Sequence, residues 1–293
     1  MIARIIDGQA IAREIRAEVA KEIENLKAKR GVTPALAVVL VGDDPASASY
    51  VRGKTRDCAE VGIYSETFRL PADSSQDDVL DIVSQLNRHA SFHGILVQLP
   101  LPKQVNETKV LSLVSPDKDV DCLHPMNLGK LVQGHPIFLP ATPAGVQQML
   151  VRSGYSPEGK HVVICGRSNI VGKPLAAMLA QKSSGANATV TVCHTGTVDL
   201  AHHTRDADIL VVATGYPNTV TRDMVKEGAV VIDVGINRID DPASPGKNKL
   251  VGDVDFEGVK EVAAAITPVP GGVGPMTRAM LLVNTLKAAQ IYL

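Results

Sequence analysis

The sequence lacks a net charge of either sign, a close cysteine pair and a long apolar run. Its 30 Lys and Arg residues balance 31 Asp and Glu residues, which leaves a formal net charge of −1. Such a balance gives no general attraction to nucleic acid or to an anionic membrane surface. We therefore expect a small-molecule partner, with neither nucleic acid nor a membrane involved.

The four cysteines are widely spaced, and none belongs to a CxxC pair. They are Cys58, Cys122, Cys165 and Cys193. This spacing favours neither a disulfide framework nor a zinc knuckle and indicates a reducing compartment. The chain starts without the basic and apolar regions of a signal peptide, and no apolar run reaches about 18 residues. We therefore expect a soluble, cytoplasmic protein. We also expect no metal site, because the adjacent His202 and His203 cannot share one helix face.

Helix and strand patterns alternate along the chain in two series, which suits the two domains expected for 293 residues. The first series predicts helices at 7–31, 45–61 and 75–88 and strands at 35–41, 65–70 and 94–99. The second series predicts helices at 144–152, 173–181 and 276–289 and strands at 161–165, 189–193, 209–213 and 229–234. The polar stretch 240–249 predicts a surface hairpin or loop.

This alternation indicates an α/β fold with parallel strands and helices on both faces of each sheet. We predict one domain from residues 1–141 plus 276–293 and a second from residues 142–275. The division assumes that the final helix returns to the first domain.

The strand expected at 161–165 leads into a glycine-containing turn that is followed by a helix. The turn is Gly166-Arg167-Ser168-Asn169-Ile170-Val171-Gly172. Glycine lets a backbone approach a pyrophosphate closely, and a helix N-terminus offers unpaired N–H groups. Because the spacing is not GxGxxG, a plain strand-to-helix turn is the alternative. The context favours a Rossmann-type dinucleotide site.

The end of the next strand indicates the type of dinucleotide. An NAD site usually has a carboxylate there, whereas this strand ends Cys193-His194-Thr195. Arg167 and Ser168 could instead bind a 2′-phosphate, so we predict NADP. Two later strands also end in glycine turns, which usually line the ligand crevice. The candidate cofactor-binding residues are Gly166, Arg167, Ser168, Ile170, Val171, Thr195, Thr214, Gly215, Gly235 and Ile236.

Polar residues in the first half form candidate catalytic groups. Tyr50 and Lys54 stand four apart on an expected helix, so their side chains share one face. Gln98 lies at the end of an apolar strand, where its amide needs a partner or a ligand. Asp119 and Asp121 lie in a polar turn, for which ordinary turn chemistry is the alternative.

Together these motifs resemble the bifunctional methylenetetrahydrofolate dehydrogenase/methenyltetrahydrofolate cyclohydrolases. The resemblance is carried by Tyr50 with Lys54, Val97-Gln98-Leu99-Pro100-Leu101-Pro102, Lys118-Asp119-Val120-Asp121, Gly166-Arg167-Ser168 through Gly172-Lys173-Pro174, and Pro270-Gly271-Gly272-Val273-Gly274-Pro275-Met276-Thr277. These segments occur in the family's order and span essentially the whole chain.

The resemblance implies an enzyme that oxidises 5,10-methylenetetrahydrofolate with NADP and hydrolyses the methenyl product to 10-formyltetrahydrofolate. It implies that Lys54 is the catalytic lysine, oriented by Gln98 and helped by Tyr50, and that Asp121 anchors the pterin. For that role the pKa of Lys54 must be lowered by burial or by the cationic intermediate. The implied substrate contacts are Tyr50, Gln98, Leu99, Pro100, Asp121, Pro270, Gly271 and Gly272. The family's habit implies a homodimer formed through the second domain.

The chain departs from the family pattern at two positions. Cys122 stands where we expect glycine, so a left-handed turn there would be strained or would shift Asp121. Ala141 replaces a frequent cysteine and looks harmless.

Three alternatives remain open at this point. Another two-domain oxidoreductase, resembling shikimate or amino-acid dehydrogenases, would explain the second domain but not Gln98-Leu99-Pro100 or Asp119-Val120-Asp121. A non-catalytic homologue is disfavoured by the retention of Tyr50, Lys54, Gln98 and Asp121. An enzyme with only one of the two activities is also possible.

Overall fold

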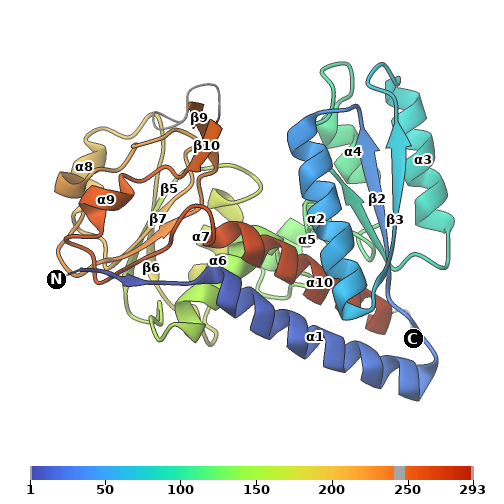
Figure 1. The fold of residues 1–293 in the computed structure, drawn as a ribbon, viewed down its shortest axis with the longest axis horizontal. Coiled ribbons are helices and arrows are strands. Elements are labelled where there is room, and N and C mark those ends of the chain that lie inside the picture. The colour runs from blue at the N-terminus through green and yellow to red at the C-terminus, as the bar shows by residue number, and fades with distance from the viewer. Residues whose placement is uncertain (1, 241–247, 292–293) are drawn as a thin grey trace. The chain divides into compact units, whose positions relative to one another are not determined.

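The computed structural model describes residues 2–240 and 248–291, and its backbone forms two compact units (Figure 1). Residues 13–141 and 278–293 form one, here called the three-stranded unit. Residues 1–12 and 142–277 form the other, here called the six-stranded unit. Each unit contains one main parallel sheet, as the alternating pattern predicted. The expected α/β class and its two domains are thus confirmed.

The three-stranded unit has a parallel sheet in the order β3-β2-β4, with helices on both sides. Figure 1 shows α2 and α3 on opposite sides of this sheet. The bounds are β2 Ala35–Val41, β3 Tyr64–Leu70, β4 Gly94–Val97, α2 Pro45–Val61, α3 Gln76–Arg88, α4 Glu107–Leu113 and α5 Pro125–Val132. Every residue of β2 is buried, because this central strand is covered on both faces.

The turn at 118–121 is attached to the edge of β4. Ile95 donates its backbone N–H to the Lys118 carbonyl at 2.7 Å, and Ile95 pairs with Asp119 in parallel fashion. A Cβ on Gly94 would lie 2.7 Å from the Val120 side chain, so glycine is required for this close approach. The pairing places the polar turn beside the strand that leads into Gln98.

The six-stranded unit has a parallel sheet in the order β1-β11-β8-β7-β5-β6. Its strands are β1 Arg4–Ile5, β5 His161–Cys165, β6 Thr189–Cys193, β7 Ile209–Val212, β8 Val230–Asp233 and β11 Ala265–Ile266. The helical segments are α6 Ala141–Arg152, α7 Gly172–Leu179, α8 Leu200–Thr204, the 3₁₀ turn Arg222–Met224 and α9 Phe256–Val259. The chain runs outward from β5 to β6 and returns to β7 on the other side of β5. This reversal is the topological switch point at which such sheets bind ligands.

Two long helices contain residues of both units. α1 spans Gly8–Arg30 and is capped by Asp7, whose carboxylate accepts the Ala10 N–H at 2.9 Å. α10 spans Val273–Ile291, and its Asn284 donates to the carbonyls of Val120 and Leu139 in the three-stranded unit, both at 2.8 Å. The C-terminal helix therefore returns to residues of the first half of the chain, as predicted.

One part of the expected domain division needs correction. We assigned residues 1–12 to the domain with Lys54, whereas they belong to the six-stranded unit. The reason is that β1 pairs in parallel with β11. A strand of two residues is too short to show a periodic pattern.

Other differences concern short elements and strand ends. The expected strand 94–99 ends at Val97, although the Gln98 N–H still donates to the Val39 carbonyl at 2.9 Å. The loop expected at 240–249 lies largely outside the described residues. On either side of it, β9 Asn237–Asp240 and β10 Asn248–Val251 pair in antiparallel fashion. No helix in the described part of the chain is both long and apolar enough to span a membrane.

Candidate active site

The side chain of Lys54 is buried on the inner face of α2. The helix begins after Asp44, whose carboxylate accepts the Ser47 N–H at 2.7 Å, and ends at Gly62 in the left-handed conformation. Lys54 is 9% exposed, and its Nζ donates to Gln98 Oε1 at 3.1 Å. The contact thus joins the two residues that sequence spacing singled out, although they are 44 positions apart.

The amide of Gln98 is oriented by a second hydrogen bond. Its Nε2 donates to the Leu99 carbonyl at 2.7 Å, which leaves Oε1 directed at Lys54. An amide is neutral, so this contact orients the lysine without stabilising the ammonium as a carboxylate would. Tyr50, one turn before Lys54 on α2, is 40% exposed and offers an aromatic ring to a ligand.

Burial lowers the pKa of Lys54 below the usual lysine range, and this effect exceeds the opposing influence of Asp121. Burial has the opposite effect on a carboxyl, so it raises the pKa of Asp121, while the nearby Lys54 lowers that pKa. The buried amine of Lys54 and the half-buried carboxyl of Asp121 therefore lie close enough to influence each other's protonation. Shifts of this kind are typical of groups that transfer protons.

The turn that holds Asp121 is kept in place by its neighbours. The buried Lys118 donates to the carbonyls of Leu86 and His89 at 3.2 and 2.8 Å. The Asp119 carboxylate accepts two backbone N–H groups and the side chain of Asn127, at 2.8 to 3.1 Å. Asp119 therefore stabilises the turn, which is the ordinary role of an aspartate in a turn.

Asp121 itself makes no hydrogen bond within the described part of the chain. Its side chain is half-buried, so both carboxylate oxygens remain able to accept bonds from a ligand. The next residue, Cys122, has a φ of 58°. This is the left-handed conformation for which we expected a glycine. The Cys122 thiol is buried and donates to the Phe138 carbonyl at 3.3 Å.

Sequence reasoning missed an ion pair beside Lys54. Arg278 of α10 places its Nε 2.9 Å from Asp57 Oδ2, and the Asp57 side chain is only 2% exposed. Arg278 Nη1 lies 2.6 Å from the point where a Cβ on Gly53 would stand. These residues lie far apart in the sequence, and no spacing could have paired them.

In the six-stranded unit, the turn after β5 has no room for side chains at two glycines. A Cβ on Gly166 would lie 2.2 Å from the Ala213 carbonyl oxygen, and one on Gly172 would lie 2.0 Å from the Gly166 carbonyl oxygen. The Gly166 φ of 131° also excludes most other residues. Arg167 and Ser168 are exposed at this turn, and Ser168 Oγ accepts the Val171 N–H at 3.1 Å. The backbone forms a close-fitting cradle before α7, as a pyrophosphate requires.

Two buried carboxylates hold the turns after β7 and β8. Asp253 Oδ2 accepts the backbone N–H groups of Thr214 and Gly215 at 2.6 and 2.8 Å. Asp233 Oδ1 accepts those of Gly235 and Asp253, both at 2.9 Å. Burial raises the pKa of Asp233 to about 6, against the lowering effect of these backbone donors. Sequence reasoning found the glycine turns but missed the two aspartates that orient them.

Leu99 and Pro100 follow β4 in the three-stranded unit, with Leu99 half-buried and Pro100 exposed, and the remaining candidates belong to the six-stranded unit. Ile170 and Ile236 are apolar yet 47% and 44% exposed, and Thr195 is exposed after β6. The 270–272 loop packs on the start of α1, because the Gln9 N–H donates to the Gly271 carbonyl at 3.1 Å. A Cβ on Gly8 would lie 1.9 Å from the Gly272 carbonyl oxygen.

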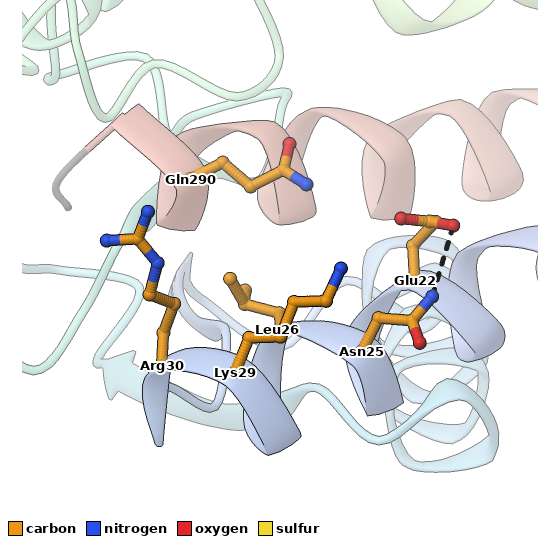
Figure 2. A pocket seen from close by; sticks show the side chains of 6 residues that line it. All are labelled: Glu22, Asn25, Leu26, Lys29, Arg30 and Gln290. Carbon is orange, nitrogen blue, oxygen red and sulfur yellow. Dashed lines mark hydrogen bonds between the residues drawn. The ribbon is translucent and has the colours of Figure 1, made fainter.

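A surface hollow elsewhere in the three-stranded unit contains none of the predicted site residues. Figure 2 shows its lining, in which Asn25 donates to Glu22 at 3.4 Å. The lining residues are Glu22, Asn25, Leu26, Lys29, Arg30 and Gln290. Among residues 2–240 and 248–291, no group of three or more His, Cys, Asp or Glu side chains is arranged to hold a metal ion.

A doubly wound parallel sheet with a glycine cradle, together with an α/β unit that buries a lysine, defines a two-domain nucleotide-dependent enzyme. Two family models match the chain. One, described as the tetrahydrofolate dehydrogenase/cyclohydrolase catalytic domain, matches residues 6–121. The other, the NAD(P)-binding domain of the same family, matches residues 140–293. The chain belongs to the tetrahydrofolate dehydrogenase/cyclohydrolase family.

Individual proteins agree with this assignment over their full lengths. The bifunctional protein FolD of Syntrophus aciditrophicus is 58% identical over 291 residues, 99% of each chain. The crystal structure of the Campylobacter jejuni bifunctional FolD enzyme is 47% identical, with a TM-score of 0.93, over 99% of this chain and 100% of the other. The Trypanosoma brucei FolD structure, complexed with NADP and an inhibitor, is 40% identical with a TM-score of 0.93, over 99% and 98%.

Proposed function

We propose that this enzyme oxidises 5,10-methylenetetrahydrofolate to the methenyl form with NADP and then hydrolyses that product to 10-formyltetrahydrofolate. The observation that carries the proposal is the buried Lys54 amine, held by Gln98 and close enough to Asp121 to share its electrostatic environment. Family membership supports both reactions. The shikimate-dehydrogenase-like alternative loses its support, because the match includes the catalytic domain as well.

Hydrolysis requires a group that takes a proton from water as it attacks the methenyl carbon. A neutral Lys54 amine would accept that proton and donate it to N5 as the bond between N5 and the same carbon breaks, while the remaining hydroxyl proton is released to solvent and the formyl group stays on N10. The lowered pKa of Lys54 supports this role, since an amine of ordinary pKa is protonated at neutral pH. Gln98 would hold the amine in place, and Tyr50 would pack against the folate.

Asp121 is proposed to anchor the substrate. The pterin ring presents an amino group and a ring N–H side by side, and a carboxylate can accept both as parallel bonds. Among the described residues none is hydrogen-bonded to the Asp121 carboxylate, which supports this assignment. Leu99, Pro100 and the 270–272 loop are proposed as further substrate contacts.

NADP is proposed to bind at the cradle between β5 and α7 and to accept the hydride from the methylene carbon when bound. The Gly166 backbone would approach the pyrophosphate, and Arg167 with Ser168 would bind the 2′-phosphate. The other proposed contacts are Ile170, Val171, Thr195, Thr214, Gly215, Gly235 and Ile236. The six-stranded unit would therefore hold the cofactor and the three-stranded unit the catalytic groups.

We also propose a cytoplasmic homodimer that binds neither nucleic acid nor membranes. The four free, buried cysteines support a reducing compartment. The strand β6 lies at the edge of its sheet with Val192 36% exposed, and an exposed edge can pair with a second copy. Gel filtration would test the dimer against the 31.0 kDa mass of one chain.

An absorbance assay with 5,10-methylenetetrahydrofolate and NADP tests the proposal by following reduced cofactor and the methenyl compound separately. We expect cofactor reduction with little methenyl accumulation. Reduction with full methenyl accumulation would indicate a dehydrogenase alone, and no reduction with either NADP or NAD would overturn the proposed function. Comparable catalytic efficiency with NAD would contradict only the preference for NADP.

A further inference from the structure

Arg278 reaches from α10 to the face of α2 that carries Lys54. Gly53, the residue before Lys54, leaves open the space that the guanidinium fills, since its Cβ would lie 2.6 Å from Arg278 Nη1. On the other side, Asp57 Oδ2 lies 2.9 Å from Arg278 Nε as an ion pair, although the two atoms are not aligned as a hydrogen bond. The Arg278 side chain is 24% exposed, whereas Asp57 is almost completely buried. The positive charge is therefore held at one position beside Lys54.

The charged and titratable groups around Lys54 come from three segments. Asp121, in the turn beside β4, and Cys58, on α2, favour the protonated ammonium. Arg278, on α10, disfavours it, in the same direction as burial. Gln98 is a neutral amide, and Asp57 is engaged with Arg278 on one side and with Arg56 at 3.3 Å on the other. Among the described residues, Arg278 is the cation whose charge disfavours protonation of Lys54, and its influence is smaller than that of burial or of Asp121.

We propose that Arg278 is a positioning residue for Lys54, whose guanidinium, held by Asp57 in the space left by Gly53, opposes a second positive charge on the neighbouring amine. The consequence for catalysis rests on the proposed function, because the neutral amine is the form that takes a proton from water. Asp57 offsets part of the guanidinium charge. The two members of the ion pair therefore act on Lys54 in opposite directions.

The test is a pH titration of the Lys54 side chain by NMR of protein labelled with ¹³C-lysine, in which Lys54→Met identifies the signal. Arg278→Met should raise the measured pKa of Lys54, because a nearby like charge is removed. Asp57→Asn should lower it, because the guanidinium is then less neutralised. Arg278→Lys, which keeps the charge, should stay close to the wild-type value.

Removing one member of a buried ion pair can also destabilise the fold. Gly53→Ala avoids this difficulty, since it keeps both charges, favours the helix and displaces the guanidinium through the added methyl group. It should raise the pKa of Lys54 by less than Arg278→Met does. Unchanged values in Arg278→Met and Gly53→Ala, or shifts of the same sign in Arg278→Met and Asp57→Asn, would overturn the proposal.

The pH profile of methenyl hydrolysis gives a second measure. Its rising limb should move with the NMR value in each variant, to higher pH for Arg278→Met and to lower pH for Asp57→Asn. A chain without cyclohydrolase activity would contradict the proposed function and leave the NMR result to decide the role of Arg278. Slower hydrolysis with an unmoved Lys54 pKa would mean that Arg278 acts only on the fold.

Discussion

The two units place their functional groups in different ways. In the three-stranded unit the candidate groups are polar and titratable side chains, among them the buried Lys54, which is 9% exposed and held by Gln98. In the six-stranded unit they are stretches of backbone, made close-fitting by Gly166 and oriented by Asp233 and Asp253. Chemistry in the first unit should therefore respond to a change of charge, and binding in the second to an added methyl group.

Neutralising Asp121 should have the largest effect on the chemistry of the three-stranded unit. Asp121→Asn replaces one acceptor with a donor, so one of the two bonds to the pterin should be lost. A charge-assisted bond is worth about 1.5–3 kcal/mol, which predicts a roughly 10- to 100-fold rise in the KM for folate in both reactions. Steady-state kinetics would measure this. The matched control is Asp117→Asn in the exposed part of the same turn, and equal KM values for the two variants would refute the anchoring role.

The second test adds a methyl group in the six-stranded unit. Gly166→Ala would put a Cβ 2.2 Å from the Ala213 carbonyl oxygen, so the turn must move. We expect at least a tenfold loss of NADP affinity by calorimetry and a loss of about 1–3 kcal/mol in the free energy of unfolding. Gly154→Ala is the control, since Gly154 has a φ of 85° but open space around it. Equal effects on NADP binding would show that close approach at Gly166 is unimportant.

The third test concerns the pH dependence of stability. Because burial raises the pKa of Asp233 to about 6, the folded state binds this proton more tightly than the unfolded state. The stabilisation from proton uptake is complete below the unfolded pKa of 3.8 and is lost as the pH rises through about 6. Relative to Asp233→Asn, the wild type should lose about 2–3 kcal/mol between pH 4 and pH 7. Denaturant unfolding at several pH values would measure the difference, and a constant difference would contradict the raised pKa.

The smallest expected effect is at Cys122, where a side chain occupies a left-handed position with a φ of 58°. Cys122→Gly should be more stable than Cys122→Ala by about 1 kcal/mol, because both lose the thiol but only glycine relieves the strain. Both variants should keep the KM for folate within about threefold of the wild type, since Asp119 holds the turn independently. An alanine variant as stable as the glycine variant would indicate that the turn carries no strain.

Local patterns were sufficient to predict the long elements. The helix that carries Lys54 and the buried strand 35–41 follow from apolar periodicity, whereas the left-handed turn at Cys122 was expected only from the family resemblance. The contact between Lys54 and Gln98 was implied by the family resemblance, because the residues alone marked the two only separately, by a shared helix face and by a strand end.

The rest depends on contacts between distant parts of the chain. The pairing of Arg278 with Asp57 joins residues more than 200 positions apart, and the roles of Asp233 and Asp253 appear only when the turns after β7 and β8 come together. Strand β1, with two residues, carries no pattern at all. Tertiary contacts determined these features, and no local preference could have indicated them.

The central claim is that the buried amine of Lys54 carries out the hydrolysis. The most direct test supplies 5,10-methenyltetrahydrofolate without any cofactor to the wild type and to Lys54→Met, and follows the decay of its absorbance. We predict at least a 100-fold slower decay for Lys54→Met, as expected for loss of a general base, while its hydride transfer in the coupled assay persists. The exposed Lys29→Met is the control. Equal decay rates for the wild type and Lys54→Met would contradict the claim.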